Sequence, residues 1–253
     1  MALYTDGSPS TIEDLRGYES SLLDVARVEQ IDLDGKLALA AGEVGDELIA
    51  FLLRRPSQDP QAANRRQMGL STVVVTDGVK RWHTLHTLAT VFSDAFSSQL
   101  NDRFRNKYEQ YAAFAQTAKQ RAFEYGVGVV ETAVPRASTP VCSSGAGTEA
   151  ATNYYVSASW IGAGEGAASF PTTYETAAGS TLAVAVAAVP SGVTGWNVYA
   201  GLTRESMARQ NSSPLAIGAT WLLPPGGLTP GAPPSQGQDA DVWVAGQRTL
   251  IRG

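Results

Sequence analysis

The stretch KRWHTLHTLATVFSDAFSSQLNDRFRNKYEQYAAFAQTAKQRAFEY, residues 80–125, decides the fold of the first half of this 253-residue chain. Its apolar side chains recur at steps of three and four residues, which places them along one face of an α-helix. This stripe consists of Leu85, Leu88, Phe92, Phe96, Leu100, Phe104, Tyr108, Tyr111, Ala115, Ala118, Ala122 and Tyr125. The pattern predicts one long helix that ends before Gly126, or two helices if Ser97–Ser98 or Asn101–Asp102 interrupts it.

A single helix of that length is more than a 140-residue globule can easily bury. Either part of the stripe contacts another subunit, or the helices form an ordinary antiparallel bundle. Upstream, Ser10 or Thr11 can cap a helix whose first turn carries carboxylates, which suit the helix dipole. A second helical segment is predicted from Asp46 to Pro56.

The two halves of the chain differ in composition. Residues 1–140 hold 15 Lys+Arg and 18 Asp+Glu, whereas residues 141–253 hold 4 and 6. The second half holds 16 of the 25 glycines, 8 of the 13 prolines and four of the five tryptophans. Charge-rich helices followed by short strands and turns predict an α+β multidomain protein.

Alternating patterns after residue 140 predict an immunoglobulin/fibronectin-like β-sandwich. The expected strands lie at 154–160, 181–189, 195–201 and 214–221, separated by Gly- and Pro-rich turns. We therefore expect a helical bundle with one long helix at 1–140 and a β-sandwich at 141–235. An extended C-terminal tail at 236–253 would either dock on a partner or pair with an earlier element.

Charge is also uneven within the first half. Residues 1–52 carry 11 acids and 3 bases, whereas residues 53–140 carry 7 acids and 12 bases. Such segments can pair within one subunit or between identical neighbours. The net charge of −5 does not favour nucleic-acid binding, and the single cysteine excludes a disulfide-stapled scaffold.

No motif in the sequence predicts a catalytic, metal or cofactor site, and we expect a protein that is not an enzyme. His83 and His86 have a spacing that could share a metal, but no third ligand is nearby in the sequence. The segment Asp32–Gly35 predicts a turn rather than a calcium loop. The Gly162–Gly166 glycines lack the βαβ unit of a nucleotide site. Cys142 has no histidine base near it in the sequence.

Candidate contact residues are therefore basic pairs and the hydrophobic tail. The basic pairs could touch DNA phosphates or an acidic protein surface, or form a solvated or salt-bridged face. They are Arg54, Arg55, Arg65, Arg66, Lys80, Arg81, Trp243, Leu250 and Ile251. No signal peptide is recognisable in MALYTDGSPS, and no apolar run reaches about 20 residues, so we expect a protein made in the cytoplasm without a membrane span.

Two sets of residues resemble known families. TGWNVYAG (194–201), PLAIGATW (214–221) and YYVSASWIGAGEG (154–166) resemble the immunoglobulin/fibronectin-like modules of bacteriophage virion proteins. The helical stretch from Lys80 to Tyr111 is similar to the head-to-tail adaptor (connector) proteins of tailed phages.

The resemblance implies a structural virion protein without catalytic residues. Such adaptors form a ring, usually a dodecamer, between the portal protein and the neck or tail proteins, and they leave a channel for the genome. It implies a location at the head–tail interface and leaves open a non-specific contact with the DNA in the channel. The alternative is a tail-, fibre- or capsid-associated module that binds carbohydrate or a cell surface through Trp160, Trp196, Trp221 and Tyr199.

Overall fold

The computed structural model describes residues 1–54, 68–99 and 101–246 and shows an α+β protein with two compact units. The helical unit comprises residues 7–131 and 239–253, and the β unit comprises residues 1–6 and 132–238. The boundary between the units thus lies at Glu131–Thr132, earlier than the division after Pro140 expected from composition. Residues 1–6 therefore belong to the β unit, although the helical unit follows them directly in sequence. Residues 239–253 belong to the helical unit, although they follow the β unit directly.

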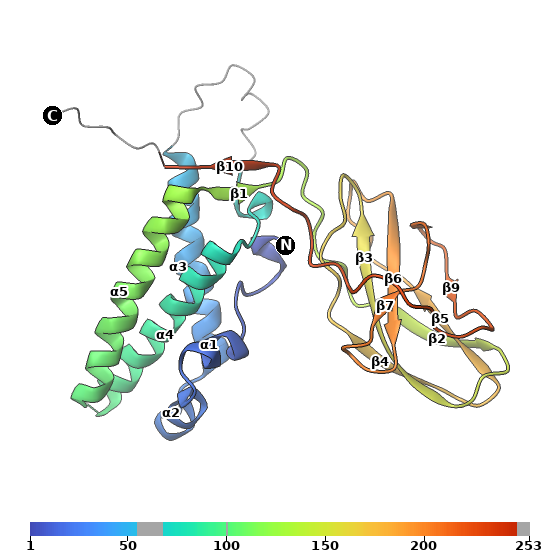
Figure 1. Cartoon of the computed structure of the whole chain (residues 1–253), viewed down its shortest axis with the longest axis horizontal. Coiled ribbons are helices and arrows are strands. Elements are labelled where there is room, and N and C mark those ends of the chain that lie inside the picture. The colour runs from blue at the N-terminus through green and yellow to red at the C-terminus, as the bar shows by residue number, and fades with distance from the viewer. Residues whose placement is uncertain (55–67, 100, 247–253) are drawn as a thin grey trace, which may run out of the picture. The chain divides into compact units, whose positions relative to one another are not determined.

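The described part of the helical unit contains the helices labelled in Figure 1 and a short 3-10 turn. Their bounds are α1 Ile12–Tyr18, α2 Leu22–Glu29, α3 Leu33–Leu53, η3 Leu70–Thr72, α4 Asp77–Gln99 and α5 Asp102–Tyr125. The β unit begins with the turn η1, Tyr4–Asp6.

Helices α1 and α3 each begin at a capping residue. Thr11 caps α1 in a capping box, in which its hydroxyl accepts from the Asp14 amide and Asp14 accepts from the Thr11 amide. Asp32 caps α3 by accepting from the Asp34 amide at 3.1 Å, so the segment read as a turn is a helix start. The prediction of a helix beginning at Asp46 was wrong, because this residue lies inside the 21-residue helix α3.

The stretch 80–125 forms two helices instead of one. Asn101 has extended backbone angles, and its side chain accepts from the Arg103 amide at 3.0 Å, which starts α5 afresh. The helices α4 and α5 run side by side as a hairpin (Figure 1). Phe92 of α4 stacks on Tyr111 of α5 with ring centroids 5.6 Å apart. The hairpin therefore buries most of the apolar stripe within one subunit, as the bundle alternative required.

The C-terminal tail returns to the helical unit. Strand β10, Val242–Val244, pairs antiparallel with β1, Val127–Val129, which directly follows α5. Val73 bridges the other edge of β1 at Val129. The second alternative for the tail, pairing with an earlier element, is therefore the one observed for these residues.

Gly128 allows the tail to lie close against β1. A Cβ atom at Gly128 would lie 2.9 Å from the Ala240 Cβ and 3.3 Å from the Thr76 Cγ2. We expect Gly128→Val to lower the free energy of unfolding by about 2 kcal/mol, the usual range for overpacking. Helical circular dichroism during denaturant unfolding measures this loss, and limited proteolysis near Ala240 measures release of the tail. Gly17→Val is the control, because a Cβ there meets no atom within 4 Å; an equal loss in both variants would contradict the prediction.

The β unit contains two antiparallel sheets in its described residues. One sheet has the order β2–β5–β9 and the other the order β4–β3–β6–β7, with β8 also pairing with β6 (Figure 1). The strands are β2 Val141–Ala146, β3 Thr152–Ile161, β4 Thr172–Thr176, β5 Ser180–Ala185, β6 Gly195–Gly201, β7 Ala208–Arg209, β8 Leu215–Ala216 and β9 Trp221–Leu222.

One apolar core joins the two sheets. Its buried side chains come from both sheets and from the segment before β2. They include Val134, Val156, Ala158, Trp160, Leu182, Val184, Trp196, Val198, Trp221 and Leu223. Trp160 and Trp196 are directly paired across β3 and β6, so two large indoles fill the centre.

The Pro- and Gly-rich segment 224–238 belongs to the β unit. The amide of Ala168 donates to Ser235 O, and the amide of Arg209 donates to Ala232 O. A Cβ at Gly231 would lie only 2.3 Å from Arg209 O, so this close approach requires glycine. The segment therefore lies against the edge strand β7 and the 166–169 loop.

Candidate functional site

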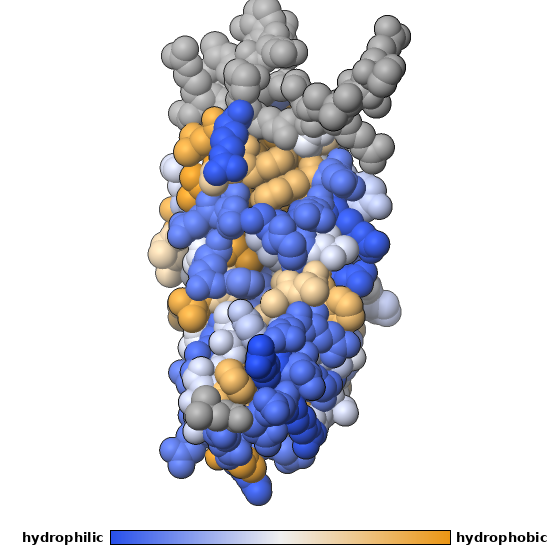
Figure 2. All heavy atoms as spheres, turned by 90° about the vertical axis from the view of Figure 1, so that its left-hand side faces the viewer, coloured by the Kyte–Doolittle hydropathy of each residue, from blue (hydrophilic) through white to orange (hydrophobic). Residues whose placement is uncertain are grey.

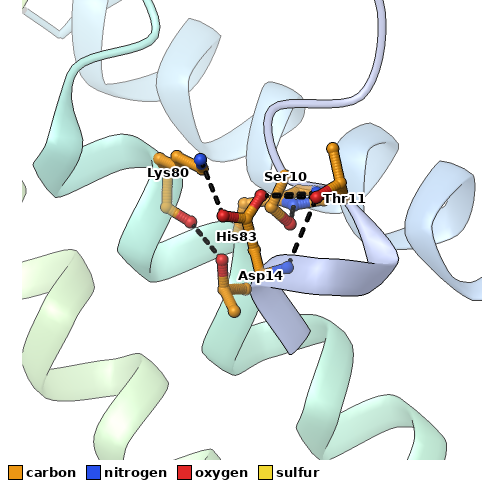
Figure 3. Close-up of polar contacts among 6 residues, drawn as sticks. Ser10, Thr11, Asp14, Lys80 and His83 are labelled. Atoms are coloured by element: carbon orange, nitrogen blue, oxygen red, sulfur yellow. Dashed lines mark hydrogen bonds and ion pairs between the residues drawn. The ribbon is translucent and has the colours of Figure 1, made fainter. Parts of the chain in front are cut away.

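A buried serine–histidine pair lies where three helical segments of the helical unit meet (Figure 3). Ser10 and His83 are almost fully buried, and Ser10 Oγ lies 2.6 Å from His83 Nδ1. His83 Nε2 lies 3.1 Å from the Leu37 carbonyl oxygen. Because a carbonyl only accepts, Nε2 carries the proton and Nδ1 accepts from the serine hydroxyl.

The electrostatics of this pair favour the neutral imidazole. Burial lowers the pKa of His83 to about 4, against a smaller opposing effect of its hydrogen bond to Leu37. A neutral histidine next to a serine could act as a general base. Here both ring nitrogens and the hydroxyl are engaged inside the core, so the arrangement joins α4 to α3 and to the start of α1.

A surface ion pair flanks the buried pair. Lys80 Nζ lies 2.7 Å from Asp14 Oδ1 (Figure 3). Burial alone would raise the pKa of Asp14, but the hydrogen bonds from Lys80 and Thr11 outweigh it and hold the pKa below its usual value. Lys80, a candidate contact residue, is therefore engaged within its own subunit, where it joins α4 to α1.

His86 does not share a site with His83. Its Nε2 lies 2.5 Å from Glu43 Oε2 on α3, so it forms an ion pair that is separate from the Ser10–His83 contact. No group of three or more His, Cys, Asp or Glu residues able to hold a metal occurs in residues 1–54, 68–99 and 101–246. The spacing of the two histidines thus reflects two different contacts of α4.

The glutamate contacted by His86 lies in a groove bounded by α3, α4 and α5, with a volume of about 660 Å³. Three ion pairs cross from α3 to the neighbouring helices. They are Lys36–Asp94 at 2.8 Å, Glu43–His86 at 2.5 Å and Glu47–Lys119 at 2.7 Å. These charges largely neutralise one another, so the groove presents few free charges to a ligand.

A second groove, of about 430 Å³, lies between α1, α4 and α5 and differs in its chemistry. Its floor consists of buried Leu85, Ala118 and Ala122, and its walls include exposed aromatic and arginine side chains. We call Tyr18, Arg81, Phe114, Arg121 and Tyr125 the aromatic–arginine groove. Neither guanidinium has a carboxylate partner within ion-pair distance among the described residues, although Asp77 lines the same groove.

Tyrosine, phenylalanine and arginine are the residue types enriched at protein–protein contacts. Of the aromatic–arginine groove, Arg81 was predicted from the sequence as a contact residue, whereas Arg121, Phe114 and Tyr18 were not. Tyr125 was placed on the buried stripe, yet 73% of its surface is exposed. Phe114 lies outside the apolar stripe of α5. An aromatic residue outside the buried face of an amphipathic helix was the sequence signal that could have identified it.

Figure 2 shows one face of the helical unit, on which hydrophilic residues predominate and separate apolar areas lie between them. Among its described residues, this unit exposes the large apolar side chains of Tyr18, Leu23, Val28, Leu39, Leu53, Tyr108, Phe114, Tyr125 and Trp243. Scattered apolar residues are normal on a soluble surface, but their grouping at a groove with arginines makes this groove the candidate contact site.

The β unit holds a polar cluster that the sequence analysis did not anticipate. Glu165 Oε1 accepts from Ser159 Oγ at 2.5 Å, from Asn197 Nδ2 at 2.8 Å and from the Tyr199 hydroxyl. Burial alone would raise the pKa of Glu165, but these three hydrogen bonds and nearby Arg209 outweigh it and lower the pKa. The cluster fastens the glycine-rich 162–166 turn to the sheet.

The tryptophans proposed as a carbohydrate platform are buried. Trp160, Trp196 and Tyr199 are at most 1% exposed, and Trp221 is 7% exposed. A sugar-binding platform needs exposed rings, so these four side chains serve as core and not as a binding face. Cys142 is partly buried, and burial raises the pKa of its thiol to about 11, which disfavours the reactive thiolate.

The remaining candidate contact residues have separate positions. Arg54 is the exposed C-cap of α3, Arg81 lines the aromatic–arginine groove, and Trp243 is 52% exposed on β10. Five candidates lie outside the described residues: Arg55, Arg65, Arg66, Leu250 and Ile251. Of the four described candidates, Lys80 is paired with Asp14, and Arg54, Arg81 and Trp243 lie at separate positions on the helical unit.

The oppositely charged segments pair within one subunit at several points. Besides Asp14–Lys80 and Glu47–Lys119, Lys107 Nζ lies 2.5 Å from Glu19 Oε2. The Tyr111 hydroxyl donates to the same carboxylate at 3.1 Å. Several acids of residues 1–52 thus pair with bases of residues 53–140 and hold α1 and α3 against the α4–α5 hairpin. Arg81 and Arg121 are bases that have no such partner among the described residues.

Comparison of the chain with family models, curated proteins and solved structures found no match. Among the helices of the described residues, none combines the length and the apolar character needed to cross a lipid bilayer.

Proposed function

We propose that this protein is a structural subunit of a tailed-phage virion, the head-to-tail adaptor between the portal protein and the neck or tail proteins. The observation that carries the proposal is the aromatic–arginine groove on the α4–α5 hairpin, the helices whose sequence resembles such adaptors. An exposed groove rich in aromatic and arginine side chains is suited to contact another protein. In this role the protein would assemble as a ring, with twelve copies as in most adaptors, around a channel for the genome.

We further propose that the β unit is an immunoglobulin/fibronectin-like module. The topology supports this, because β2 pairs with β5 in one sheet while β3 pairs with β6 in the other. The chain thus passes between the sheets from β2 to β3, from β4 to β5 and from β5 to β6, as in Greek-key sandwiches. Because Trp160 and Trp196 are buried in the core and offer no binding face, the module is suited to a scaffold role, in which it reinforces the particle or contacts its neighbours.

Co-expression with the cognate portal protein tests the adaptor function. We expect the chain to co-purify with portal rings at near-physiological salt and to add a layer to them in negative-stain images. A portal from an unrelated phage is the control and should carry no such layer. Cognate portal rings recovered without the chain would contradict the proposed function. Loss of binding in higher salt would indicate that charged contacts contribute to the interface.

A further inference from the structure

We propose that the aromatic–arginine groove of one subunit receives the outer face of helix α3 from a second copy of the same chain. This inference deepens the proposed function, because a ring requires a contact between two different surfaces of identical neighbours. The groove offers an apolar floor and two guanidinium groups that form no ion pair with any described residue. Its occupant must therefore be an apolar surface that carries a carboxylate, which arginine binds through directed hydrogen bonds.

The outer face of α3 has this chemistry. Leu39 and Leu53 are 49% and 76% exposed, although α3 is otherwise packed on its own unit through Val44 and Leu48. A Cβ at Gly42, in the middle of this exposed face, would meet no atom within 4 Å. The face is therefore open and smooth at its centre, which allows large side chains of a neighbour to approach closely.

Asp46 supplies the charge on this face. It is exposed, and it forms no ion pair within the described residues, unlike Glu43 and Glu47 on the same helix. On the helix it lies one turn after Gly42, so its carboxylate is next to the open part of the face. The only base of α3, Lys36, is already paired with Asp94.

The two guanidinium groups of the groove can reach one carboxylate together. Gly78 of α4 faces Ala122 of α5, since a Cβ at Gly78 would lie 3.8 Å from the Ala122 Cβ. Arg81 is one turn further along α4, and Arg121 precedes Ala122, so both flank the same level of the hairpin. We therefore expect Asp46 of one copy to lie between Arg81 and Arg121 of the next.

The contact joins two different surfaces. The groove is lined by Phe114, Thr117 and Arg121 of α5, whereas Lys119 and Phe123 of the same helix contact α3 of their own subunit. The groove and α3 thus flank different sides of α5, and α3 cannot enter the groove of its own subunit. A contact of this kind continues from copy to copy and closes into a ring when the rotation allows.

Directed cross-linking of the full chain tests this contact. In a Cys142→Ser background, Gly42→Cys and Thr117→Cys chains are purified separately, mixed at high concentration and treated with a short bismaleimide. We expect covalent dimers in the mixture, none from either single variant, and a ladder of higher species from the chain carrying both cysteines. Val28→Cys mixed with Thr117→Cys is the matched control, because Val28 is exposed on α2 and should give no dimer.

Charge exchange identifies the residues of the contact. We expect Asp46→Arg to lower the yield of cross-linked dimer about tenfold, and Arg81→Asp with Arg121→Asp in the partner chain to restore it. Asp34→Arg, at the first turn of α3, is the control and should leave the yield unchanged. Dimers from a single cysteine variant, no dimer in the mixture, or a yield insensitive to Asp46→Arg would each overturn the inference. Portal binding is measured separately, so its failure would count against the proposed function alone.

Discussion

Between pH 6.5 and pH 4.5, the helical unit is expected to lose stability steadily, and His83 is the cause. The pKa of His83 is about 4 in the folded protein and about 6.5 when the chain is unfolded. Above pH 6.5 both states hold a neutral imidazole, so the stability is complete. As the pH falls, the unfolded chain binds a proton first, and the free energy of unfolding decreases by about 3 kcal/mol by pH 4.

Denaturant unfolding followed by helical circular dichroism at a series of pH values measures this effect. We expect His83→Gln to lower the stability at neutral pH and to remove most of the dependence between pH 6.5 and 4.5. The control is Ser97→Ala on the exposed part of α4, which removes no titratable group and should keep the wild-type slope. The carboxylates of Asp14 and Glu19, whose pKa values are lowered, lose their contributions at more acidic pH. A wild-type slope in His83→Gln would refute the assignment.

The second large effect is expected in the β unit. Glu165→Ala removes the only carboxylate that accepts from Ser159, Asn197 and Tyr199, and all three side chains are at most 1% exposed. Leaving these donors without an acceptor is expected to cost about 3 kcal/mol of unfolding free energy. Glu165→Gln keeps an acceptor oxygen and should lose about 1 kcal/mol.

Tryptophan fluorescence during denaturant unfolding measures the loss, because three buried indoles lie in the core of this unit. Glu175→Ala is the matched control, since Glu175 is an exposed residue of β4 and its removal should change the stability by less than about 0.5 kcal/mol. If Glu165→Ala and Glu175→Ala were equally stable, the cluster would have no role in fastening the 162–166 turn. The pKa of Glu165 is lowered, so its contribution is present at neutral pH and is lost in acid, as the pH falls through this lowered pKa.

The helical half shows which features of the fold can be predicted from sequence. The three-and-four spacing in 80–125 predicted the buried face, because that face is a property of the helix itself. Whether Asn101 ends one helix and starts another depends on a balance between continued helix and hairpin packing. One continuous helix and two helices were both predicted as possible at this position. The stacking of Phe92 on Tyr111 favours the two-helix hairpin.

The β half shows what spacing cannot give. Asn197 and Tyr199 alternate with core residues, which predicts a solvent-exposed face, yet every residue of β6 is buried. The segments that cover the strand are the 162–169 loop and the 208–211 and 229–236 stretches. Their contacts follow no regular spacing in the sequence, so the spacing of residues could not predict this burial. Polar side chains on such a strand are buried because Glu165 and Asn211 satisfy their hydrogen bonds.

The candidate site was predictable only in part. Paired basic residues led to Arg81, but Arg121 stands alone in the sequence and meets Arg81 only because α4 and α5 fold back on each other. Lys80, next to Arg81, was an equal candidate, yet it is neutralised by Asp14 from a segment about 65 residues away. Which base stays free is decided by the positions of acids on other helices, and this needs the tertiary structure.

The pairing of β10 with β1 has a consequence for the order in which the protein is made. A ribosome completes β1 and then synthesises the entire β unit before Val242–Val244 emerge. The helical unit therefore lacks β10 throughout the synthesis of residues 132–238. Contacts that depend on the complete helical unit can therefore form only after residues 132–238 have been synthesised.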